Sequence, residues 1–127
     1  VAFFEVGLGH KSVSAAALAS TPWILSLLSL VVSPFLEEVL FRGFVLRELL
    51  GFTGLAFANP LASVLFVGVH LPYWLSHGGL THAVMTNCTG IFLFSLLAGW
   101  LFARTGSVWP PTLAHAANNT LSALLVG

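Results

Sequence analysis

The sequence predicts an all-α fold, a polytopic transmembrane helix bundle of about four spans. Composition is the first observation, because 57% of the 127 residues are hydrophobic and only 6% are charged, whereas about a quarter of the residues in a soluble domain are charged. Length is the second, since four stretches approach the roughly 20 mostly apolar residues that cross a bilayer. The third is the lack of the period-two alternation of a membrane barrel. We therefore expect an integral, multi-pass membrane protein, located in the cell membrane if its source is a prokaryote.

The first expected helix covers residues 22–50. It contains Pro34, which lacks a backbone N–H and should kink the helix. Gly51 follows the last residue, as is typical of a helix C-terminus. Residues 51–59 are then expected to connect this helix to the next one.

Three shorter helices are expected to follow. Residues 60–74 form the second, which Pro72 should interrupt. Residues 83–103 form the third and residues 110–126 the fourth, with residues 76–81 connecting the second and third. Formal net charge is zero, so no nucleic-acid partner is expected.

The few charged residues are concentrated in one segment, residues 37–48, directly after an apolar stretch. Ionisable groups at membrane depth are costly and persist mainly where a paired or hydrated interior uses them. Glu38 and Arg42 are four apart and share a helix face, with the glutamate in the favourable N-terminal position. We expect this pair to hold helices together, because a buried charge needs its partner. Glu37 points about 100° away and is the carboxylate expected to carry chemistry.

Two further polar sets lie on other helices. Phe66 and His70 share a face of the second helix. Taken alone, His70 is more typical of a hydrogen-bonded interior residue than of a catalyst. His115 and Asn119 share a face of the fourth helix. Such a pair can donate hydrogen bonds to a developing oxyanion or join helices, and the spacing leaves both readings open.

Together these residues suffice for amide hydrolysis without a covalent intermediate. Glu37 and His70 could polarise a water molecule as general base, while His115 and Asn119 hold the oxyanion. Glu37, His70 and His115 could equally bind a catalytic zinc, which commonly takes three protein ligands. The chain has no aspartate, no Gly-x-Ser and no His-Glu-x-x-His, which excludes aspartyl-dyad proteases, the usual serine motif and the standard zinc helix. A glutamate-based hydrolase or a metal site of unusual ligand spacing remains.

These motifs resemble those of the CPBP intramembrane proteases. That family includes the type II CAAX prenyl endopeptidases and bacterial proteins of bacteriocin processing and self-immunity. Its three patterns, Glu-Glu-x-x-x-Arg, Phe-x-x-x-His and His-x-x-x-Asn, occur here in the family's order within residues 34–119. The matching residues are Glu37, Glu38, Arg42, Phe66, His70, His115 and Asn119. The whole chain, residues 1–127, is accordingly read as a single membrane-embedded protease core.

The resemblance implies an endopeptidase that cleaves a membrane-associated or prenylated peptide or protein, as in CAAX processing. In the family, the residues matching Glu37 and His70 activate water, and those matching His115 and Asn119 form the oxyanion hole. The other matched residues would support the site: Glu38, Arg42 and Phe66. Members usually carry further membrane helices ahead of the first motif, so this chain is expected to be a minimal version or the core of a larger bundle.

The resemblance also bears on the cofactor and the partners, and one competing function remains. Members are often labelled metalloproteases, yet we expect no obligatory cofactor; zinc is the alternative and would use Glu37, His70 and His115. Membrane lipid and a peptide or lipid-modified protein substrate are the expected partners. The competing hypothesis is a non-catalytic membrane protein with the same fold, such as a self-immunity protein, a scaffold or a transporter. A transporter needs no His/Asn pair, which favours hydrolysis.

Overall fold

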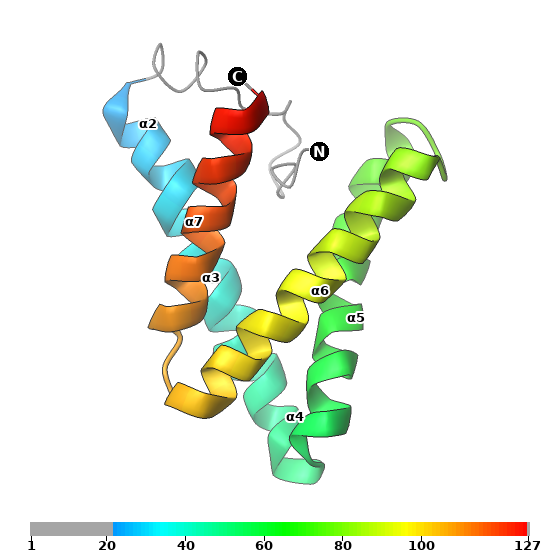
Figure 1. Cartoon of the computed structure of the whole chain (residues 1–127). Helices are drawn as coiled ribbons and strands as arrows, with labels where there is room; N and C mark the ends of the chain where they lie inside the picture. The colour runs from blue at the N-terminus through cyan, green and yellow to red at the C-terminus, as the bar shows by residue number, and fades with distance from the viewer. Residues whose placement is uncertain (1–21, 127) are drawn as a thin grey trace.

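The computed structural model describes residues 22–126, and every regular element in that range is helical (Figure 1). Many outward side chains are large and apolar, including those of Phe44, Leu65 and Leu93, and such a surface suits contact with lipid tails. Within this range, three helices are long and apolar enough to cross a membrane: Trp23–Phe52, Leu55–Ser76 and His82–Thr105. The prediction of an all-α, multi-pass membrane protein is confirmed.

The first helix is one continuous run that contains two π-helical segments, in which the turns are wider than in an α-helix. Buried Pro34 is the second residue of the α-helical segment that follows the first of them. A proline ring crowds the carbonyl of the preceding turn, and a wider turn there accommodates the ring without ending the helix. The five segments in order are α2 (Trp23–Leu27), η1 (Leu28–Val32), α3 (Ser33–Glu38), η2 (Val39–Leu46) and α4 (Arg47–Phe52).

The second helix, α5 (Leu55–Ser76), is longer than expected at both ends. It contains both Pro60 and Pro72, so the predicted connection over residues 51–59 and the predicted interruption at Pro72 are wrong. His70 consequently lies inside a continuous helix rather than at its end.

Contacts with the next helix explain why these prolines do not end α5. Near Pro60, the buried Asn59 side chain donates a hydrogen bond from Nδ2 to the carbonyl of Leu96 at 2.9 Å. Just beyond Pro72, Trp74 is buried in a cluster with Val84 and Ile91. Packing against a neighbouring helix commonly compensates for the backbone bonds that proline removes from membrane helices.

The last two helices, α6 (His82–Thr105) and α7 (Trp109–Val126), follow their expected ranges closely. The Thr81 side chain accepts a hydrogen bond from the Val84 N–H at the start of α6, which is the usual role of an N-cap threonine. Gly106 ends α6 in the left-handed conformation, with φ of 67°, which glycine adopts without a steric cost. Unlike the other three helices, α7 is not among the apolar candidate spans.

The helices bring the three motifs to one interior. α5 and α6 form an antiparallel hairpin, and α7 packs beside η1 and α3 (Figure 1). η2 contacts both helices of the hairpin, and α6 also contacts α7. The motif-bearing segments α3, η2, α5 and α7 are therefore arranged around a common centre.

α5 and α6 approach closely where Asn59 meets Gly99. Both residues are buried, and a Cβ atom added at Gly99 would overlap the Asn59 side-chain oxygen. Glycine at this position therefore lets the amide of Asn59 reach the α6 backbone.

We predict that Gly99→Ala destabilises the protein by about 1–3 kcal/mol, the usual cost of overpacking, as measured by thermal unfolding in detergent. Gly68→Ala on α5 is the control, because no atom lies within 4 Å of its added Cβ. Equal unfolding temperatures for the two variants would contradict the proposed close contact.

Candidate active site

The two adjacent glutamates of α3 face different surroundings. The Glu38 side chain is fully buried, whereas that of Glu37 is 17% exposed. Successive helical residues are about 100° apart, so the two carboxylates point in different directions. Glu38 makes buried contacts with Arg42 and His115. Glu37 faces the space between the three motifs, here called the motif centre. Ser33, one turn earlier, donates a hydrogen bond to Glu37 Oε1 at 3.3 Å. The other oxygen, Glu37 Oε2, is buried and has no hydrogen-bond partner among the described residues.

Glu38 connects the first helix to the last. Its Oε2 lies 3.1 Å from Arg42 Nη1; the atoms are not aligned as a hydrogen bond, so the contact is an ion pair. Its Oε1 lies 2.9 Å from His115 Nδ1 on α7. The predicted Glu38–Arg42 pairing is observed, and it includes a histidine that the sequence spacing did not link to it.

This contact fixes which nitrogen of His115 carries a proton. A carboxylate paired with an arginine can only accept hydrogen bonds, so His115 Nδ1 must be protonated. His115 Nε2 then faces the motif centre, 3.9 Å from Glu37 Oε2.

His70 is oriented by the same principle with a different partner. Its Nδ1 lies 2.7 Å from the backbone carbonyl of Phe66, which can only accept, so Nδ1 is the protonated nitrogen. Its Nε2 lies 4.0 Å from Glu37 Oε2. Two imidazole nitrogens thus point at one unpartnered carboxylate oxygen, each too far for a direct hydrogen bond and near enough to share one water-sized bridging group.

Phe66 is an apolar residue that packs at this centre. Its ring is almost completely buried, and its centroid lies 4.9 Å from that of His70 and 6.2 Å from that of His115. The Arg42 guanidinium lies 4.7 Å from the same centroid, within cation–π range. Phe66 therefore contacts three polar side chains of the motifs, while its expected supporting role stays a prediction.

Asn119 is the last of the motif residues along the chain. It lies one turn beyond His115 on α7 and is 1% exposed. Its side-chain oxygen is buried and makes no hydrogen bond within the described part of the chain. Buried amides are normally hydrogen-bonded, so the Asn119 side chain is available to form a hydrogen bond with a bound ligand.

The residues present do not fit the zinc alternative. Four ligand atoms on a tetrahedral ion with bonds of about 2.1 Å lie about 3.4 Å apart, whereas Glu37 Oε2 is 3.9 and 4.0 Å from the two Nε2 atoms. Over residues 22–126, no group of three or more His, Cys, Asp or Glu side chains is arranged to hold a metal ion.

Several further residues that were not predicted contact the centre, among them Phe94 on α6, whose ring centroid lies 5.1 Å from that of His115. Ser33 and Trp74 each lie four residues from a motif residue, a spacing that could have identified them; Trp74 stacks on His70 with centroids 5.9 Å apart. Ser95 on α6 receives hydrogen bonds from Arg42 Nη2 at its Oγ (2.7 Å) and its backbone carbonyl (3.0 Å). No sequence pattern indicated Ser95.

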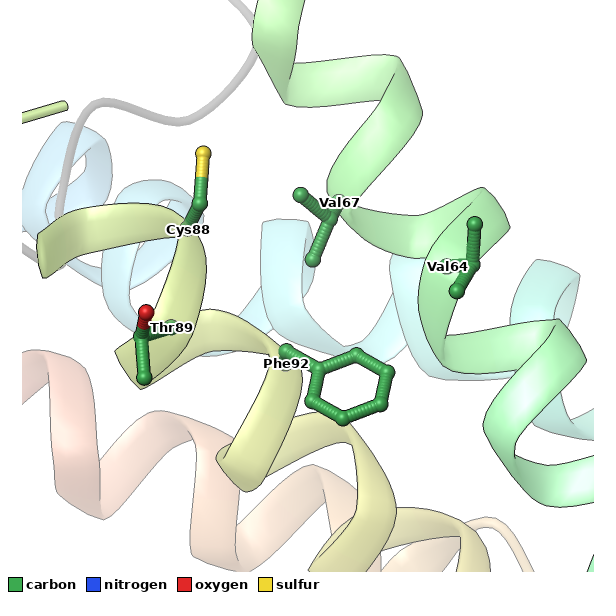
Figure 2. A pocket seen from close by; sticks show the side chains of 5 residues that line it. All are labelled: Val64, Val67, Cys88, Thr89 and Phe92. Atoms are coloured by element: carbon green, nitrogen blue, oxygen red, sulfur yellow. The ribbon is translucent and has the colours of Figure 1, made fainter. Parts of the chain in front are cut away.

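A separate hollow of about 280 Å³ lies between α5 and α6, outside the motif residues (Figure 2). Its lining is mainly apolar, and the Phe92 ring reaches from α6 toward Val64 of α5 (Figure 2). Two of the lining residues also pack against the cluster that contains Phe66 and Trp74. The lining residues are Val64, Val67, Cys88, Thr89 and Phe92.

The helices and the buried centre define a class: an integral, multi-pass membrane protein with a carboxylate and two histidines converging inside the bundle. Comparison with known families agrees with this class. A family model described as "Type II CAAX prenyl endopeptidase Rce1-like" matches residues 19–121. The chain belongs to this family of membrane peptidases.

One curated relative is the "Putative membrane peptidase YdiL" of Bacillus subtilis (strain 168). It is 28% identical to this chain over 128 residues, which cover 98% of this chain and 48% of the relative. The chain therefore spans about half the length of that protein. No solved structure gives a significant match.

We predict that Arg42→Ala lowers the yield of folded protein and its unfolding free energy by about 3–5 kcal/mol, because it leaves the Glu38 carboxylate buried without its cation. Folded yield is measured by size-exclusion chromatography in detergent. Arg104→Ala is the control, since Arg104 is exposed at the end of α6. Normal yield and stability combined with lost activity would instead give Arg42 a direct part in the chemistry.

Proposed function

We propose that the protein is an intramembrane endopeptidase that hydrolyses a peptide bond with a water molecule activated by Glu37 and His70. The convergence of Glu37 Oε2 with the Nε2 atoms of His70 and His115, at 4.0 and 3.9 Å, carries this proposal. Membership of a membrane peptidase family supports it.

Water activation follows from the hydrogen-bonding capacity of the side chains. Glu37 Oε2 has no hydrogen-bond partner within residues 22–126, so it is free to accept a proton from water. In its neutral form, His70 presents an unprotonated Nε2, because its proton is on Nδ1 and directed at the Phe66 carbonyl. In the proposed step, the water oxygen attacks the carbonyl carbon, one water proton passes to Glu37, and the other is oriented by His70.

The carbonyl oxygen then becomes an oxyanion that needs hydrogen-bond donors. His115 can supply one in its doubly protonated form, with Nδ1–H directed at Glu38 and Nε2–H at the oxyanion. Asn119 would supply the second from its amide nitrogen. The intermediate collapses by breaking the C–N bond, and the proton on Glu37 passes to the leaving nitrogen.

The proposed substrate is a membrane-associated or prenylated peptide or protein. The centre lies among apolar helices, so a substrate must reach it from the bilayer or its surface. The family description names CAAX prenyl endopeptidases, which makes CAAX processing the specific activity to test.

We predict that Glu37→Gln and His70→Ala each lower turnover by at least about 10²–10⁴-fold, the contribution of general-base catalysis. The assay uses protein reconstituted in liposomes, with a farnesylated CAAX peptide and a membrane-spanning peptide as probes. Glu48→Gln and His82→Ala are matched controls, because both residues are exposed. Full turnover by folded Glu37→Gln would refute the mechanism. A folded wild-type protein that cleaves neither probe would favour the non-catalytic alternative.

We also predict that the chelators EDTA and 1,10-phenanthroline leave most of the cleavage activity intact, because the proposed water is activated by Glu37 and His70 alone. Activity is measured before and after chelation, with and without added zinc. Loss of activity that zinc restores would favour the metal-dependent reading of the same residues.

A further inference from the structure

Ser95 on α6 accepts hydrogen bonds from the motif residue Arg42 at both its hydroxyl oxygen and its backbone carbonyl. Its hydroxyl oxygen and its backbone carbonyl accept from the same Arg42 nitrogen, Nη2, at 2.7 and 3.0 Å. Ser95 and Arg42 are both 2% exposed, so water does not compete effectively for these bonds.

The Ser95 contact determines how Arg42 meets Glu38. With Nη2 held by Ser95, the other terminal nitrogen, Nη1, is directed at Glu38 Oε2, 3.1 Å away. The Phe66 ring lies against another side of the guanidinium and restricts its movement there. Hydrogen bonds to charged groups are stronger and more directional than neutral ones, so Ser95 and Phe66 together restrict Arg42 to one orientation.

Arg42 in turn restricts Glu38, whose remaining oxygen accepts from His115 Nδ1 at 2.9 Å. A continuous series of buried contacts therefore runs from Ser95 through Arg42 and Glu38 to His115. His70 is outside this series, because its Nδ1 is held by the Phe66 carbonyl.

We propose that Ser95 is a positioning residue for His115, acting through Arg42 and Glu38 to hold the imidazole with Nδ1 protonated and Nε2 toward Glu37. The inference rests on the proposed function for its catalytic meaning, but the orientation of His115 is measurable without any substrate. It gives α6, which carries no motif, a defined part in the centre.

The test is ¹⁵N NMR of the histidine-labelled 127-residue chain in detergent, which distinguishes the two neutral tautomers and the imidazolium. The ring signals are assigned with His115→Gln and His70→Gln proteins. In Ser95→Ala, the His115 ring signals are expected to shift or broaden, while those of His70 keep their wild-type positions. Ser95→Thr, which retains the hydroxyl, is expected to keep the wild-type His115 signals.

Ser63→Ala is the matched control, because Ser63 is fully buried on α5 and its hydroxyl has no hydrogen-bond partner among the described residues. It should leave both histidine spectra unchanged. If Ser95→Ala fails to fold, the nearly isosteric Ser95→Cys, whose sulfur is a weak acceptor, is used and is expected to show the same selective change. A folded Ser95→Ala or Ser95→Cys protein with unaltered His115 signals would overturn the inference.

Kinetics add a second readout. Where wild-type protein cleaves a probe, Ser95→Ala should lower kcat by about 10–100-fold, as is typical of residues that orient a reacting group through another side chain, with little change in KM. Absence of wild-type cleavage together with the selective NMR change would count against the proposed function and not against the positioning by Ser95. An unchanged kcat in Ser95→Ala would count against the inference alone.

Discussion

The buried ion pair between Arg42 and Glu38 is the constraint on which the rest of the centre depends. Two charges removed from water are stable only when their geometry is good and their remaining hydrogen-bonding groups are satisfied. Here Nη2 of Arg42 donates hydrogen bonds to Ser95, and Oε1 of Glu38 accepts one from His115. Satisfying one ion pair therefore joins the first helix to α6 and α7 and sets the orientation of a histidine.

The need to satisfy buried polar groups also explains why the two histidines have the same orientation relative to Glu37. Both His70 and His115 use Nδ1 for a fixed acceptor, so both turn Nε2 toward Glu37. Glu37 remains without a hydrogen bond at Oε2. The protein thus surrounds one uncommitted carboxylate oxygen with side chains whose other polar atoms are already engaged. This division of committed and free groups is what a water-activating site requires, and it accords with membership of a membrane peptidase family.

The sequence predicted the helices well and their boundaries at proline poorly. Composition and apolar length suffice for an all-α membrane protein, because a helix satisfies its own backbone in lipid. The errors lie at Pro60 and Pro72, both inside α5. A proline's cost is local and visible in sequence, whereas the contacts of Asn59 and Trp74 with α6 that offset it are not. The reading of the chain as a single domain stays a prediction.

By itself, the sequence determined the residue types of the centre and the helices that carry them, because spacing along a helix fixes which residues share a face. It also separated Glu37 from the Glu38–Arg42 pair. Only the tertiary structure decided that Glu38 bonds His115, that Ser95 holds Arg42, and that both histidines turn Nε2 toward Glu37. These contacts join residues on different helices, so they depend on how the helices pack and rotate against one another, which no local spacing specifies.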